Sequence, residues 1–138
     1  GLDYALSMEG SLKLKEVSYI HSESYAAGEL KHGTISLIED GMPVISVATQ
    51  SDLIAKTISN IVEVKSRGAM NILVCSEACA RTLEDGIADY VIKVPQTDEL
   101  LMPISAVVPL QILAYYTAVN KGNDPDKPRN LAKSVTVE

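Results

Sequence analysis

Three charged residues, Glu9, Lys13 and Glu16, stand at positions i, i+4 and i+7 near the start of the chain. In a helix this spacing puts them on one stripe, with a carboxylate on each side of an ammonium group. Partly buried charges of opposite sign shift one another's pKa, and proton-transfer chemistry exploits such shifts. The stripe therefore allows two interpretations: acid and base groups that line a cleft, or a ladder of ion pairs on a partly exposed helix.

The rest of this helix, predicted over residues 2–20, makes the position of the stripe unusual. Ser7, Ser11 and Ser18 fall on one side of the helical wheel, which should face solvent. Gly10 costs about 1 kcal/mol relative to Ala inside a helix, so we expect close packing or close backbone approach there. The stripe falls opposite the serines, among the apolar residues Leu2, Ala5, Leu6, Leu12 and Ile20.

His32 is a second candidate for proton transfer. It directly precedes Gly33 at the end of a segment of small residues, which places it at a helix end or in a loop. A histidine there can act as a general acid or base near neutral pH. Its position alone is equally that of an ordinary surface histidine.

The elements that must position these residues alternate between strands and helices. Apolar runs predict buried strands at residues 43–49, 71–76 and 89–94. Helices are predicted at residues 51–66, 77–84 and 103–120, with short helices and a loop at 22–38 and a polar tail at 123–138. Ser51 or Asp52 is the expected N-terminal cap of the helix at residues 51–66. The helix at residues 103–120 could begin regularly only at Pro109. This order predicts βαβ units, a parallel sheet and an α/β fold, and the leading helix suggests that the first strand is missing.

Size and composition indicate one soluble globular domain. The chain has 138 residues, 46% of them hydrophobic, and a net charge of −6 with no basic patch outside the tail, which argues against nucleic-acid binding. We find no run of 18 apolar residues and no signal peptide, so we expect no membrane span and a cytoplasmic location. Cys75 and Cys79 fit neither a redox pair nor a zinc site, so we expect no metal and no cofactor.

Three longer motifs carry a resemblance to a known family. They are residues 9–21 (EGSLKLKEVSYIH), 25–33 (YAAGELKHG) and 126–138 (DKPRNLAKSVTVE). Their order along the chain resembles the C-terminal part of the isomerase region in the glutamine–fructose-6-phosphate aminotransferase family. The resemblance covers essentially the whole chain.

That resemblance implies a fold and an activity. The fold is a flavodoxin-like three-layer αβα sandwich, the sugar-isomerase (SIS) domain. Members make glucosamine 6-phosphate from fructose 6-phosphate and glutamine-derived ammonia, in hexosamine biosynthesis. Residues 1–122 would be the second SIS domain, truncated at its N-terminus, and residues 123–138 a catalytic tail. The glutaminase domain and the first SIS domain would be its partners, within a homodimer.

The resemblance also implies roles for individual residues. Glu16 would move a proton between C1 and C2 of the sugar, with Lys13 as its active-site neighbour. His32 would assist ring opening from the neighbouring subunit. Lys133 would form a Schiff base with the sugar carbonyl, and Ala132 would lie beside it at the substrate. Chemically, one carboxylate over two adjacent carbons and a lysine amine at a carbonyl suit aldose–ketose isomerisation.

Two alternatives remain open from the sequence. One is another SIS-domain enzyme, such as a fructosamine-phosphate deglycase, although the tail motif argues against it. The other is a non-catalytic module that binds sugar phosphate. The turn at residues 49–52 follows a strand, where sugar phosphate could bind, but Asp52 would repel phosphate and is better explained as a helix cap. Because the first SIS domain, the glutaminase domain and the strand expected before residue 2 would be missing, we expect the chain by itself to be inactive.

Overall fold

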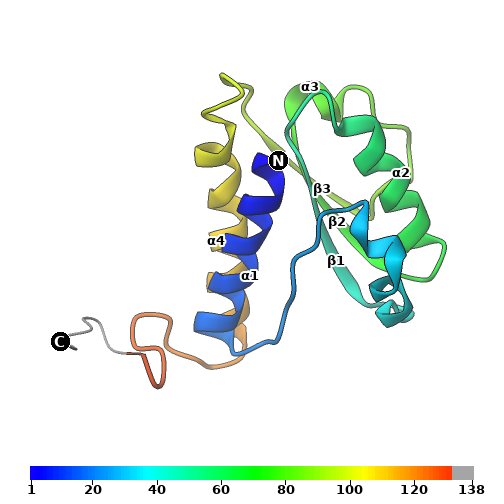
Figure 1. Ribbon diagram of the computed structural model, residues 1–138. Coiled ribbons are helices and arrows are strands. Elements are labelled where there is room, and N and C mark those ends of the chain that lie inside the picture. The colour runs from blue at the N-terminus through cyan, green and yellow to red at the C-terminus, as the bar shows by residue number, and fades with distance from the viewer. Residues whose placement is uncertain (132–138) are drawn as a thin grey trace.

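The computed structural model describes residues 1–131 and has the predicted alternation of helices and strands. Figure 1 shows a sheet with a pair of long helices on one face and shorter helices on the other. The elements are α1 (Leu2–Ser18), the 3-10 turns η1 (Glu29–His32) and η2 (Thr34–Leu37), β1 (Pro43–Ala48), α2 (Ile54–Lys65), β2 (Met70–Ser76), α3 (Glu77–Ala80), β3 (Tyr90–Val94) and α4 (Met102–Asn120).

The sheet in the described part of the chain has three parallel strands in the order β1-β2-β3. Ile45 lies opposite Ile72, and Val74 lies opposite Ile92, so the apolar runs pair in register. Parallel strands buried on both faces are expected to be apolar throughout, because neither face meets water. The predicted parallel sheet is therefore confirmed.

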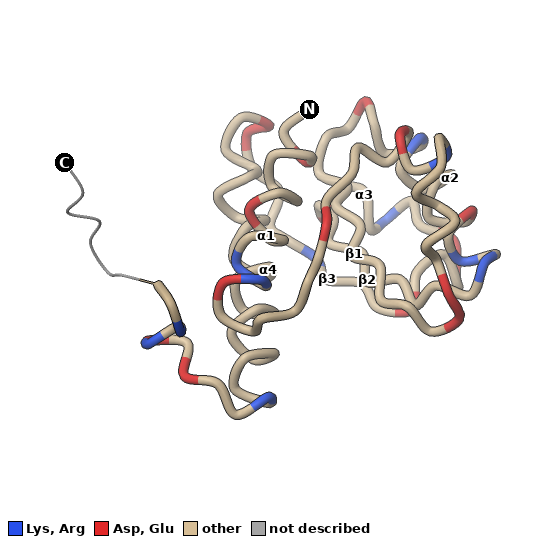
Figure 2. The backbone as a smooth tube through the Cα atoms, turned by 60° about the horizontal axis from the view of Figure 1, so that its bottom comes forward, with Lys and Arg blue, Asp and Glu red and all other residues tan. Residues whose placement is uncertain are grey.

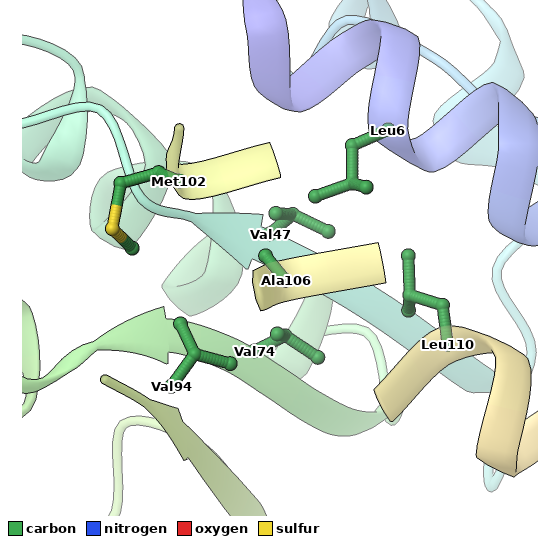
Figure 3. Packing of buried hydrophobic residues seen from close by; sticks show 7 residues of the cluster. All are labelled: Leu6, Val47, Val74, Val94, Met102, Ala106 and Leu110. Atoms are coloured by element: carbon green, nitrogen blue, oxygen red, sulfur yellow. The ribbon is translucent and has the colours of Figure 1, made fainter. Parts of the chain in front are cut away.

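Alternate residues of the strands build two separate cores. Val47, Val74 and Val94 point to the face that α1 and α4 cover, where they pack with Leu6 and other residues of the helices (Figure 3). On the opposite face, Ala48, Leu73 and Cys75 of the strands pack with Ile61 of α2 and Cys79 of α3. These five residues form the second core. Two cores around one sheet confirm the predicted three-layer αβα architecture.

Helix α4 begins at Met102 and continues through Pro109 without a break. Pro109 has no N–H to donate within the helix, which normally weakens a helix at that point. Buried Ala106 and Leu110 lie on either side of it and pack into the first core. Tertiary packing thus holds the helix together, and the later start at Pro109 that the sequence left open is wrong.

The turn between β1 and α2 differs from the prediction. Helix α2 begins at Ile54, after Leu53, and no side chain caps it, so the interpretation of Ser51 or Asp52 as its cap is wrong. The carboxylate at this turn comes instead from Asp3 of α1. It accepts hydrogen bonds from the N–H groups of Thr49 (2.9 Å) and Gln50 (3.3 Å).

The predicted solvent-facing side of α1 is also wrong. Ser18 is fully buried, and its hydroxyl donates to the Leu14 carbonyl oxygen. The exposed side carries Tyr4, Met8 and Leu12 instead. Serines that bond within the helix need no water, and their small side chains allow a neighbouring element to approach. Apolar residues occur all round α1, so the helical wheel could not identify the packed side.

Candidate functional site

The stripe on α1 forms a compact group of three charges. Lys13 Nζ lies 2.6 Å from Glu16 Oε2 and 3.7 Å from Glu9 Oε1. The side chain of Lys13 is 32% exposed, that of Glu16 25% and that of Glu9 40%. The group lies at the border of the packed side, so Glu16 is both partly desolvated and reachable from solvent. Such a position suits a carboxylate that exchanges protons with a bound molecule.

The charge state of Lys13 follows from these contacts. The hydrogen bond to Glu16 raises the pKa of Lys13 above its ordinary value of 10.5, the attraction of both glutamates adds to this, and partial burial opposes it. Lys13 therefore carries a positive charge at neutral pH and cannot serve as a base. Its hydrogen bond to Glu16 orients that carboxylate and places a positive charge beside it.

Two contacts and one backbone turn fix the position of α1. At its start, the Asp3 carboxylate binds the turn after β1, including the hydroxyl of Thr49. In its middle, a Cβ added at Gly10 would lie 2.9 Å from Leu110 Cδ1, so any side chain there would have to push the Leu110 side chain of α4 aside. The close packing predicted at Gly10 is confirmed. At its end, Tyr19 has a left-handed backbone (φ 59°) that turns the chain away from the helix.

His32 lies elsewhere in the molecule. It is the last residue of η1, as expected for a helix end, and its side chain is exposed. Lys31 Nζ lies 2.5 Å from Glu63 Oε2, and this ion pair joins η1 to α2. Since α2 covers the face of the sheet opposite α1, the chain does not bring its own His32 to its own Glu16 (Figure 1). Ala132 and Lys133 lie outside the described residues.

The surroundings of Glu16 are open. Two open hollows on the described surface, of about 400 and 310 Å³, are lined by neither Glu16 nor Lys13. The first is lined by Glu77, Ala80, Arg81 and Lys93, and the second by Lys15, Tyr19, Ile20, His21 and Arg129. The charged stripe therefore lines neither of these two hollows.

The cysteines form no part of this site. Cys75 and Cys79 are buried free thiols in the second core. Burial raises the pKa of Cys75 to about 12, and it also raises the pKa of Cys79. Neither thiol is therefore a ready nucleophile. Within residues 1–131, no group of three or more His, Cys, Asp or Glu side chains is placed to hold a metal ion.

Comparison with known proteins assigns the fold to a family. The SIS-domain family model matches residues 1–121. The chain belongs to the SIS-domain family. Helix α1, with the charged stripe, and η1, with His32, both lie within the matched SIS region.

Curated relatives of this SIS domain match the whole chain. A protein of Caldanaerobacter subterraneus subsp. tengcongensis named glutamine–fructose-6-phosphate aminotransferase (isomerizing) is 59% identical over 138 residues. A protein of the same name from Pseudomonas putida is 51% identical over 138 residues. The chain spans 22% of the length of each of these relatives. The resemblance drawn from the three sequence motifs is confirmed.

Solved structures agree with these relatives. The C-terminal domain of glucosamine-fructose-6-phosphate aminotransferase from Francisella tularensis superimposes with a TM-score of 0.84 at 39% identity, over 90% of this chain and 34% of that chain. A glucosamine-6-phosphate deaminase from Thermotoga maritima superimposes with a TM-score of 0.72 at 28% identity, over 96% of this chain and 37% of that one. The SIS fold is thereby confirmed.

Sequence reasoning missed two residues that shape the site, Asp3 and Tyr19. Each makes its key contact with a residue more than 40 positions away, Asp3 with Thr49 and Tyr19 with Arg129. No local pattern reports such contacts.

Proposed function

We propose that the chain is part of the isomerase region of a glutamine–fructose-6-phosphate aminotransferase, and that Glu16 is its proton-transfer base. The observation that carries this proposal is the half-buried Glu16–Lys13 pair on α1, in a chain that matches relatives of that name along its whole length. The substrate would be fructose 6-phosphate and the product glucosamine 6-phosphate, with ammonia derived from glutamine.

In this mechanism one carboxylate serves two adjacent carbons. Glu16 takes a proton from C1 of the opened sugar and returns it at C2, or the reverse. A single carboxylate can do both because C1 and C2 are adjacent. Lys13 stays protonated and keeps the carboxylate oriented. Lys133 forms the imine with the sugar carbonyl, Ala132 lies beside it, and His32 of a second subunit assists ring opening. The separation of η1 from α1 supports this use of a second subunit.

The surface of α4 supports the proposed partners. Six of its exposed or flanking residues are large and apolar and recur at helical spacing: Leu101, Ile104, Val108, Ile112, Tyr115 and Val119. Figure 2 shows no charged residue along α4, in contrast to α1. By length and composition α4 is the one described helix that could cross a membrane, yet its other side packs into the core. We propose that protein covers this surface, either the first SIS domain or a second subunit, in a cytoplasmic homodimer that also has a glutaminase domain.

Two substitutions on the same stripe test the role of Glu16. The full-length Caldanaerobacter relative, with its matching segment replaced by this chain, provides the context. Glu16→Gln keeps the shape but removes the base, so formation of glucosamine 6-phosphate from fructose 6-phosphate and glutamine should fall about 100-fold or more. Glu9→Gln is the matched control, because Glu9 also contacts Lys13 but has no proposed role. Its activity should stay within about twofold of the parent.

The outcomes separate the proposal from its rivals. If Glu16→Gln folds normally and retains isomerisation, the chain is a binding module and the base is elsewhere. The chain alone should produce no glucosamine 6-phosphate from fructose 6-phosphate and ammonia, because the stripe lines neither hollow of the described surface. Product formation by the isolated 138 residues would contradict that expectation.

A further inference from the structure

The segment between α1 and β1 passes from one face of the sheet to the other and carries His32 (Figure 1). No residue from 19 to 42 is buried, so apolar packing does little to hold this segment. Near its start, Ser11 and Ser22 fasten it to α1, because each hydroxyl donates to the other residue's carbonyl oxygen, at 2.9 and 3.1 Å. Further along, the position of His32 depends on other polar contacts.

Lys31 makes the contact that holds the part of the segment around His32. Its Nζ lies 2.5 Å from Glu63 Oε2 on α2. In the described part of the chain, no other hydrogen bond or ion pair joins residues 23–39 to an α-helix or a strand. Gly33 follows His32 with φ 142°, a backbone that residues with a side chain rarely adopt. His32 therefore stands at a corner between η1 and η2, one residue from the contact with α2.

Glu63 is itself firmly placed on α2. Ile61 and Val64, its neighbours along the helix, are buried. Arg67 contacts Glu63 twice: Arg67 Nη2 lies 3.4 Å from Glu63 Oε1, and Arg67 Nη1 donates to the Glu63 carbonyl oxygen at 2.8 Å. The carboxylate thus lies between two cations, and the hydrogen bond from Lys31 is the main cause that lowers the pKa of Glu63. Glu63 is a charged and fixed partner for Lys31 at neutral pH.

We propose that Glu63 is a positioning residue for His32. By binding Lys31 it holds the corner between η1 and η2 in one place against α2, and His32 meets the sugar of a second subunit from that place. This inference rests on the proposed function, which gives His32 its part in ring opening. Glu63 touches neither substrate nor reacting atoms; it acts through Lys31 and the turn.

The size of the expected effect follows from the exposure of the pair. The side chain of Lys31 is 43% exposed and that of Glu63 is 29% exposed, so water competes for both charges. An ion pair in such a position shifts an equilibrium by about two- to fivefold. Loss of the pair should therefore make the correct placement of His32 rarer by that factor, without unfolding the domain.

The first test is kinetic and uses the same full-length chimera. Glu63→Gln and Lys31→Met should each lower kcat/KM for fructose 6-phosphate about two- to fivefold. Lys31→Arg keeps the positive charge and should retain most of the activity. Glu77→Gln is the matched control, because Glu77 forms an exposed ion pair with Arg81 on α3, and its kcat/KM should equal that of the parent.

A combination with His32→Asn separates positioning from general weakening of the fold. His32→Asn alone should lower kcat/KM about 100-fold, since it removes the proton-transfer group. If Glu63 acts through His32, Glu63→Gln should cause no further loss in the His32→Asn background. A substitution that merely weakened the fold would reduce activity by the same factor in both backgrounds.

The second test does not depend on activity. Hydrogen–deuterium exchange measured by mass spectrometry reports how firmly residues 29–38 are held, because the Ser36 N–H donates to the Gly33 carbonyl oxygen at 3.1 Å within them. Glu63→Gln should raise deuterium uptake of this segment about two- to fivefold and leave that of α4 unchanged. Glu77→Gln should change neither.

Each outcome has one meaning. If His32→Asn is slow but Glu63→Gln and Lys31→Met match the parent, the positioning role is wrong and the proposed function stands. The same conclusion follows if the losses from Glu63→Gln and His32→Asn multiply. If His32→Asn is as active as the parent, the proposed role of His32 fails, and this inference fails with it. Unchanged exchange of residues 29–38 in Glu63→Gln overturns the ion pair as the support of this turn.

Discussion

Replacing Asp3 with Ala should destabilise the protein by about 3 kcal/mol, because one carboxylate joins α1 to the sheet. Its oxygens accept from the Thr49 N–H at 2.9 Å, the Thr49 hydroxyl at 2.5 Å and the Gln50 N–H at 3.3 Å. Thr49 is only 4% exposed, so water cannot easily replace the lost acceptor for its N–H. A hydrogen bond to a charged group contributes about 1.5–3 kcal/mol, and an orphaned buried donor adds to the loss.

Asp3→Asn should be intermediate, with a loss of about 1 kcal/mol. The amide keeps one oxygen for the two N–H groups, and its NH2 can donate to the Thr49 hydroxyl, which is also an acceptor. What disappears is the negative charge near the start of α1, where it is favourable. The order of stability is therefore expected to be parent, Asp3→Asn, Asp3→Ala.

Urea unfolding measures these differences as shifts of the midpoint at constant slope. Asp85→Ala, at an exposed position in a turn, is the control and should change the free energy of unfolding by less than about 0.5 kcal/mol. A double-mutant cycle with Thr49→Val should give a coupling of about 1 kcal/mol. The reasoning is refuted if Asp3→Ala is as stable as Asp85→Ala, or if the cycle shows no coupling.

Four further predictions concern the buried thiols, the packing of Gly10 and the exposed surface of α4. Cys75 and Cys79 should resist alkylation at about pH 8 until the protein unfolds, as thiol labelling with and without urea would show. Since burial raises the pKa of Cys75 in the folded state from 9.0 to about 12, its contribution to stability should be complete below about pH 8.5 and be lost as the pH rises towards 12. Gly10→Leu should lower the free energy of unfolding by about 2–3 kcal/mol, and a second change, Leu110→Ala, should restore part of it by making room; no restoration would place the clash elsewhere. Ile112→Glu should make the isolated chain more soluble but weaken dimerisation in the full-length chimera, and equal dimer stability by sedimentation would show that a second subunit does not cover this surface.

Much of the fold was predictable because its signals are local. The apolar runs around Ile45, Val74 and Ile92 identified the three strands, and alternation with helices identified the parallel sheet. The spacing of Lys13 and Glu16 placed them on one stripe, since helix geometry alone brings such residues together. Gly10 likewise pointed to close packing before its neighbour Leu110 was known.

What only the tertiary structure decided depends on contacts between distant parts of the chain. The buried side of α1 could not be read from its sequence, because apolar residues surround the helix and Ser18 satisfies its hydroxyl within it. The carboxylate at the turn after β1 is Asp3 rather than a local cap, since only the packed α1 brings it there. Tyr19, with its left-handed backbone, accepts a hydrogen bond from Arg129, 110 residues later. The charged stripe could thus be recognised from the spacing of its residues. Only the assembled fold shows which groups hold α1 in place and on which side of the sheet His32 lies.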